Sequence, residues 1–199
     1  MTIRRAAVLV LIAVAYTGLN AIKPLHIDDA ALAMNSAQDH AHPLDPYGFR
    51  MLWWYMPDPA NEILGPPVLP YSWAAGRALF GERPVLWKLG LLPWTLLLVF
   101  ALHGLLRRFA AGVELPLTVM TVIGPAPLPS LNLMLDIPAL ALSLTAIRVF
   151  LGACDRDSFG LAVLAGLVAG LAMQTKYTGA TAPAVMLLAA ATQRGATRW

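Results

Sequence analysis

The sequence predicts an all-α fold: a polytopic bundle of about six transmembrane helices with one long loop on the outer face of the membrane. Of the 199 residues, 58% are apolar and 13% are charged, whereas soluble domains carry about 25% charged residues. The mean hydropathy is +0.65, and arginines stand in pairs beside apolar runs, a pattern typical of membrane topology signals. This composition excludes a soluble enzyme, a disordered chain and a nucleic-acid-binding module, so no nucleic-acid partner is expected. The single cysteine, Cys154, excludes a disulfide framework.

The first predicted span covers residues 6–22 and follows Arg4 and Arg5. A charged start and an apolar stretch are also typical of a secretory signal peptide. Residues 19–21 form a poor cleavage site, however, and further apolar runs follow, so we expect an uncleaved span. Because arginines near a span stay in the cytoplasm, the N-terminus is predicted to be cytoplasmic and the chain to emerge outside near Lys23.

Residues 23–84 form the only long polar section, which we expect to be an outer-face loop within a single transmembrane module of residues 1–199. The loop is rich in acidic and aromatic side chains, and Trp and Tyr collect at the boundary between membrane and water. We therefore predict a folded cap on the outer leaflet, with short interfacial helices over residues 28–40 and 67–80. Proline and glycine clusters at 43–48 and 57–67 should separate the two helices.

Five further spans are predicted, over residues 85–106, 113–128, 137–151, 159–175 and 179–192. Lys88 lies near enough to one end of its span to extend outward to the surface, and Arg107 and Arg108 close the same span on the cytoplasmic side. With the N-terminus inside, every arginine pair falls on the cytoplasmic face. The acidic loop, residues 132–136 and the Lys176–Tyr177 turn then all lie outside.

Asp28 and Asp29 stand where the first span emerges. A carboxylate at the membrane surface is a candidate general base. An aspartate before a helix-forming stretch is also a common N-cap, because its oxygens accept hydrogen bonds from free backbone N–H groups. The residues alone leave both interpretations open.

Asp136, Lys176 and Tyr177 are candidate substrate-binding residues at the outer ends of the fourth and fifth spans. An ionisable residue at a span is costly and is therefore a functional candidate, and a lysine at this level could hold a phosphate. The structural alternatives are a capping role for Asp136 next to Pro138 and a membrane-interface anchor made of Lys176 and Tyr177.

A metal site is not expected, and neither is a cofactor. His26, His40 and His42 lie near Asp39 and Asp45 in the loop, but no further ligand pattern supports a metal, and solvated histidines are the better interpretation. Glu114 and Arg148 fall inside predicted spans, and the residues around them indicate no catalytic or substrate-binding role for either.

Taken together, these segments resemble the N-terminal part of the GT-C membrane glycosyltransferases, especially the bacterial protein mannosyltransferase and aminoarabinose-transferase branch of glycosyltransferase family 39 and its relatives. The resemblance covers nearly the whole chain and depends on order and spacing more than on any single motif. Its motifs are Asp28-Asp29, Leu44-Asp45-Pro46-Tyr47-Gly48-Phe49, Pro66-Pro67-Val68-Leu69-Pro70-Tyr71, Leu79-Phe80-Gly81-Glu82, Asp136 and Thr175-Lys176-Tyr177.

The resemblance implies transfer of a sugar from a polyprenyl-phosphate donor to an acceptor hydroxyl, with inversion, in the cell envelope at a bacterial-type inner or plasma membrane. It places the base at Asp28 and the second acidic residue at Asp29, and its partners are membrane lipids, the lipid-linked donor and an unspecified acceptor. Gly65 precedes Pro66 where relatives often carry Asn or Lys, so the Lys that is taken to contact the donor phosphate in the aminoarabinose branch has no counterpart at this position. Relatives also have more spans, so we expect this chain to resemble the N-terminal part of such a fold.

Two other classes fit the composition. One is a small transporter or channel subunit in which Asp136 and Glu114 act as intramembrane relay groups, although we find no paired interrupted helices of the kind transporters show. The other is a non-enzymatic membrane assembly protein that shares the fold.

Overall fold

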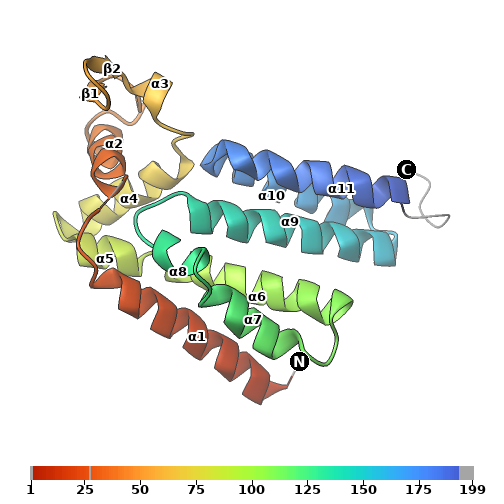
Figure 1. Cartoon of the computed structure of the whole chain (residues 1–199). Coiled ribbons are helices and arrows are strands. Elements are labelled where there is room, and N and C mark those ends of the chain that lie inside the picture. The colour runs from red at the N-terminus through yellow and green to blue at the C-terminus, as the bar shows by residue number, and fades with distance from the viewer. Residues whose placement is uncertain (1, 27, 193–199) are drawn as a thin grey trace.

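The computed structural model describes residues 2–26 and 28–192, which are mostly helical and contain a single two-stranded sheet (Figure 1). Helices α1 (Ile3–Ala21), α6 (Leu92–Phe109), α9 (Asp136–Arg156), α10 (Phe159–Thr175) and α11 (Thr181–Thr192) run side by side as a bundle. The all-α bundle predicted from the sequence is confirmed at this level.

The bundle core forms where α1, α6 and α9 meet. Leu9 and Ala13 from α1, Leu98 and Val99 from α6 and Ala141 from α9 are all at most 2% exposed. A second cluster of mostly small residues joins α9, α10 and α11 through Ala146, Ala165, Ala169, Ala182 and Met186. Small side chains let helix backbones approach closely, which is how helices commonly associate in membranes.

Three helical segments are long and apolar enough to cross a membrane: Ile3–Ala21, Pro84–Phe109 and Asp136–Arg156. The second of these combines α5 (Pro84–Leu89) with α6. Phe159–Thr175 is a shorter apolar helix with the bounds expected from the sequence. Three membrane-crossing helices, rather than about six, are therefore supported by the described residues.

The predicted span over residues 113–128 is instead broken into α7 (Glu114–Val122) and α8 (Pro127–Ser130). The nine residues of α7 extend about 14 Å, whereas the hydrocarbon core of a bilayer is about 30 Å thick. Gly124, Pro125 and Pro127 follow α7 closely, and proline cannot continue a regular helix because it lacks a backbone N–H. The described part of α11 is also short, with 12 residues.

The predicted cap gathers at one end of the bundle, at the left of Figure 1. It contains α2 (Asp29–Ala41), β1 (Arg50–Leu52), β2 (Pro57–Pro59), α3 (Ala60–Ile63) and α4 (Val68–Phe80). Helices α2 and α4 pack against each other, and their bounds confirm the two short helices expected from the sequence. The antiparallel hairpin, which pairs Met51 with Asp58, was not anticipated.

The other end of the bundle carries the start of α1 and the turns after α6 and α9 (Figure 1). Arg108 at the end of α6 forms a two-pronged ion pair with Asp155 near the end of α9, with one N–H···O distance of 2.9 Å. The arginine-rich turns and the acidic cap thus lie at opposite ends of the bundle. Which end faces the cytoplasm stays a prediction.

A candidate active-site cleft beneath the cap

A cleft of about 400 Å³ lies between the cap and the cap-side ends of α9 and α10. Asp28 precedes α2, Asp136 is the first residue of α9, and Lys176 and Tyr177 follow α10. All four line this one cleft. The structure therefore brings together four of the five site residues predicted from the sequence.

Asp136 and Lys176 form an ion pair across the cleft, with 2.5 Å between the Lys176 Nζ and the Asp136 Oδ1. Both side chains are about one-third exposed, at 37% and 34%. The Asp136 carboxylate accepts a hydrogen bond from Lys176. Among the described residues, it accepts none from the free backbone N–H groups at the start of α9, so Asp136 does not cap this helix. Tyr177 beside the pair is 71% exposed.

Asp28 is half-exposed at the start of α2 and lines the cleft. It occupies the N-cap position, but its side chain makes no capping hydrogen bond. The capping interpretation is therefore not realised here. A half-exposed carboxylate in a cleft is placed as a general base requires, because it can reach both substrate and solvent.

Asp29 turns away from the cleft into the protein. Its side chain is 0% exposed, and its Oδ2 accepts a hydrogen bond of 3.1 Å from the His26 backbone N–H. The same oxygen lies 3.9 Å from the Nζ of Lys88. Asp29 thus supports the chain next to Asp28 and does not line the cleft.

Lys88 does not extend outward to the surface as the sequence suggested, because it is only 2% exposed. Its Nζ donates hydrogen bonds of 2.7 Å and 3.1 Å to the carbonyl oxygens of Lys23 and Pro24. Together with the nearby Asp29 carboxylate, these bonds fasten the segment between α1 and α2. The sequence contains one indication of this structural role: Lys88 lies inside an apolar run, and a charged group buried in such a run needs polar partners.

Sequence reasoning missed the cap residues of the cleft. Trp53, which follows β1, is 38% exposed, and Glu62 in α3 adds a carboxylate. The Tyr47 hydroxyl donates a hydrogen bond of 2.9 Å to the carbonyl of Gly65, another lining residue. These contacts attach the loop after α2 to the wall of the cleft.

Asp39 is a buried acidic group in the cap. It is 2% exposed, and among the described residues neither carboxylate oxygen has a hydrogen-bond partner. Burial raises the pKa of Asp39 to about 6, because a low-dielectric surrounding disfavours the charged form. Burial likewise raises the pKa of Tyr47, so its hydroxyl stays a hydrogen-bond donor.

A second cavity, of about 330 Å³, adjoins the cleft at Asp136 and Thr178, which line both spaces. Its walls come from α8, α9 and the segment that begins α11, and they include Ala126, Pro127, Ile137, Ala139 and Leu140. The second cavity is mostly apolar. A cleft that carries the ionisable side chains and a mostly apolar cavity therefore meet at Asp136.

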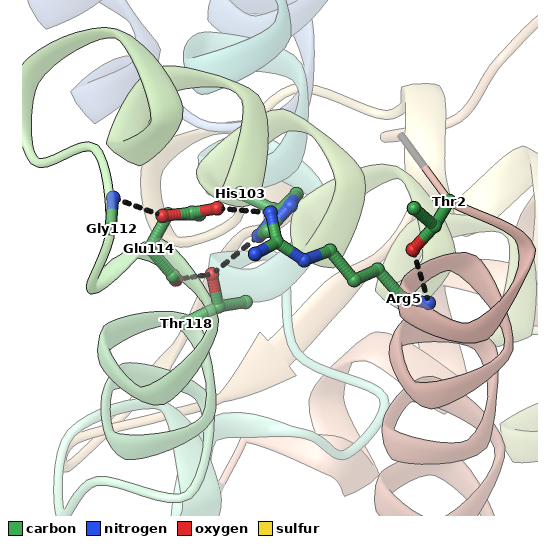
Figure 2. Close-up of polar contacts among 6 residues, drawn as sticks. All are labelled: Thr2, Arg5, His103, Gly112, Glu114 and Thr118. Atoms are coloured by element: carbon green, nitrogen blue, oxygen red, sulfur yellow. Dashed lines mark hydrogen bonds and ion pairs between the residues drawn. The ribbon is translucent and has the colours of Figure 1, made fainter.

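Another polar cluster lies at the opposite end of the bundle. Figure 2 shows the Glu114 carboxylate accepting hydrogen bonds of 2.6 Å from Arg5 and from the Gly112 backbone N–H. The Thr118 hydroxyl donates to the Glu114 carbonyl and lies 3.3 Å from the Nδ1 of His103. This cluster fastens α7 to α1 and α6. Glu114 and Asp136 thus lie at opposite ends of the bundle, each with its own cation.

The loop histidines do not form a metal site in the described part of the chain. Between residues 2 and 192, leaving out residue 27, no three His, Cys, Asp or Glu side chains gather as a metal ion would require. His26 contacts the side chain of Asn132 instead. Comparisons of the chain with protein-family models, curated proteins and solved structures found no match.

Proposed function

We propose that this chain is a membrane glycosyltransferase, or the catalytic part of one, that transfers a sugar from a polyprenyl-phosphate donor to an acceptor hydroxyl. The observation that carries the proposal is the single cleft lined by Asp28, Asp136, Lys176 and Tyr177. These residues belong to the separate segments that resemble GT-C glycosyltransferases. The cleft thus combines a carboxylate that can act as a base with a cation that can stabilise a leaving phosphate.

In the proposed reaction Asp28 accepts the proton of the acceptor hydroxyl. The acceptor oxygen forms a bond to the anomeric carbon while the bond from that carbon to the phosphate oxygen breaks, which inverts the anomeric centre. The polyprenyl phosphate leaves with the bonding electron pair. Lys176 would stabilise the charge that grows on the leaving phosphate, because a positioned cation stabilises such charge in the transition state.

The ion pair with Asp136 holds Lys176 in the cleft until the donor binds. A donor phosphate would then share the Lys176 ammonium with the Asp136 carboxylate. The neighbouring apolar cavity also supports the proposal, since it offers a place for the first isoprene units next to the phosphate. A donor with a charged phosphate and an apolar chain matches a cleft with ionisable side chains that adjoins a mostly apolar cavity.

We place the cleft on the outer face of a bacterial-type inner or plasma membrane, with the N-terminus in the cytoplasm. The arginine-rich end of the bundle supports this orientation, because positively charged residues near spans are retained in the cytoplasm. The acceptor can be a protein, a lipid or a glycan. The cap would cover the cleft from the aqueous side.

The test is transfer of a labelled sugar from a polyprenyl-phosphate sugar by membranes that contain the full-length protein. Asp28→Asn should lower the rate by about 10²–10⁴-fold, the usual contribution of a general base. Asp58→Asn is the matched control, because Asp58 lies in the hairpin of the cap and does not line the cleft. Near-full activity of Asp28→Asn would show that Asp28 is not the base.

A further inference from the structure

We propose that a separate, arginine-lined cleft at the end of the bundle opposite the cap binds the phosphate of an anionic phospholipid headgroup. This cleft has a volume of about 340 Å³ and lies between α6, α9 and α10. Arg108, Arg148 and Arg156 line it, together with one acidic residue, Asp155. The proposal is independent of the glycosyltransferase function.

The charge of the cleft is only partly compensated. Arg108 is paired with Asp155, whereas no ion pair among the described residues involves Arg148 or Arg156. Arg148 donates one hydrogen bond of 2.9 Å to the Phe100 carbonyl, and Arg156 donates one of 3.4 Å to the Gly152 carbonyl. Because a guanidinium carries five N–H donors, most of theirs are left for a ligand.

Two glycines shape the cleft around these arginines. A Cβ added at Gly104 would lie 2.3 Å from the Nε of Arg148, and one added at Gly152 would lie 3.0 Å from an Nη of Arg156. Each guanidinium therefore lies directly against a helix backbone at a glycine. The two glycines thus let both guanidinium groups lie close to the helices that line the cleft, and guanidinium groups recognise phosphate through paired N–H donors.

The position of Arg148 points to a lipid rather than to a soluble anion. Arg148 is exposed although it lies eight residues before Arg156, the last residue of α9, or about 12 Å along the helix. An exposed cation at that depth is costly in hydrocarbon unless an anion or water accompanies it. Phe109 and Phe159, at the same end of the bundle, are 71% and 74% exposed and offer surface for acyl chains.

Basic pockets between transmembrane helices commonly hold acidic lipid headgroups. The test uses the full chain in nanodiscs of phosphatidylcholine with added phosphatidylglycerol, followed by native mass spectrometry to count the phosphatidylglycerol molecules retained in detergent. Arg148→Gln should weaken retention about fivefold, the effect expected of one basic residue near a membrane surface. Gly104→Ala should also weaken it, because the new methyl group displaces Arg148 while every charge stays.

Arg107→Gln is the matched control, since Arg107 lies at the same end of α6 but does not line the cleft. Equal loss of lipid in Arg107→Gln, or unchanged retention in Arg148→Gln and Gly104→Ala, would overturn the proposal. The proposal would also be overturned if the protein in phosphatidylcholine nanodiscs bound inorganic phosphate or an acidic peptide, and added phosphatidylglycerol failed to displace it. If Arg148→Gln unfolds, Arg156→Gln provides the same comparison.

Discussion

At the scale of single residues, Asp28 and Asp29 are neighbours with opposite surroundings. Successive residues of a helix point about 100° apart, so one of the two can face the cleft while the other faces the protein interior. Asp28 lines the cleft, whereas Asp29 is buried beside Lys88. The sequence shows the pair but not which member is buried, because that depends on the turn that Lys88 fastens.

We expect Lys88→Met to destabilise the protein by roughly 3–5 kcal/mol, because it leaves the buried Asp29 carboxylate without its cation. The double variant Lys88→Met/Asp29→Asn should recover much of this loss, since it removes both charges. Chemical unfolding in detergent micelles measures the difference. Lys23→Met is the control, because the Lys23 side chain makes only an exposed hydrogen bond. Equal stability of the two single variants would contradict a structural role for the Lys88 contacts.

Asp39 should make the stability of the cap depend on pH. Burial raises its pKa from 3.8 to about 6 in the folded protein, so its contribution to stability is fully present below pH 4 and is lost as the pH rises through 6. At pH 7 the buried charge should cost roughly 2–3 kcal/mol. Tyr47 and Tyr71 are its titratable neighbours in the cap, and they stay neutral over this range.

Asp39→Asn should therefore stabilise the cap at pH 7 and flatten the pH dependence between 4 and 6. Hydrogen exchange of the α2 amides at several pH values measures both effects. Asp58→Asn serves as the control in the half-exposed hairpin. If amide protection in α2 changed with pH equally in the wild type and in Asp39→Asn, groups other than Asp39 would cause the pH dependence.

At the scale of elements, the sequence predicts helices best where apolar periodicity and end signals agree. Helix α10 has the expected bounds because Ser158 caps its start, accepting a hydrogen bond from the Leu161 N–H. The span predicted over residues 113–128 is wrong because Gly124, Pro125 and Pro127, which interrupt its apolar run, end the helix after α7. The hairpin was missed because its strands have only three residues each.

The pairing of elements explains why the site was only partly predictable. Alternating spans place Asp28, Asp136 and Lys176 at the same end of the bundle, which the sequence indicated. The Asp136–Lys176 ion pair depends on the close packing of α9 against α10, and no local pattern encodes that contact. The contribution of the cap residues Trp53 and Glu62 depends in the same way on how the hairpin folds over the cleft.

Substitution of Gly179 tests whether the packing of neighbouring elements positions the site. Gly179 lies in the 3-10 turn η1 (Tyr177–Ala180), and a Cβ there would lie 2.4 Å from the Ala172 carbonyl group of α10. Gly179→Ala should push η1 away from α10, lower stability by about 1–3 kcal/mol as overpacking does, and shift Lys176 in the cleft. Thermal unfolding and transferase activity should both fall.

Gly166→Ala is the control for this substitution, because no atom lies within 4 Å of the added Cβ. Alanine in the middle of α10 should be neutral or stabilise the helix by up to about 1 kcal/mol. If the two variants behave alike, the contact between η1 and α10 does not position the site.

At the scale of the whole molecule, the two ends of the bundle differ in charge and in chemistry. One end carries the acidic and aromatic cap (Figure 1). The other end carries Arg5 at the start of α1, Arg107 and Arg108 at the end of α6, and Arg156 at the end of α9. This separation follows from the sequence, because Arg4 and Arg5 stand at the start of α1, whereas Arg107 and Arg108 stand at the end of α6, which runs back along α1. It also predicts the orientation of the molecule in the membrane, since basic residues near spans are retained in the cytoplasm.

The last prediction concerns that direction. In a Cys154→Ser background, a cysteine at Leu44, which is 100% exposed in the cap, should react with a membrane-impermeant maleimide in intact cells. A cysteine at Phe159, 74% exposed at the other end, should react only after the cells are permeabilised. The reverse pattern would place the cap and its cleft in the cytoplasm, where a lipid-linked donor on the outer leaflet could not reach Asp28. Labelling of both sites in intact cells would mean that the bundle does not separate its two ends across a membrane.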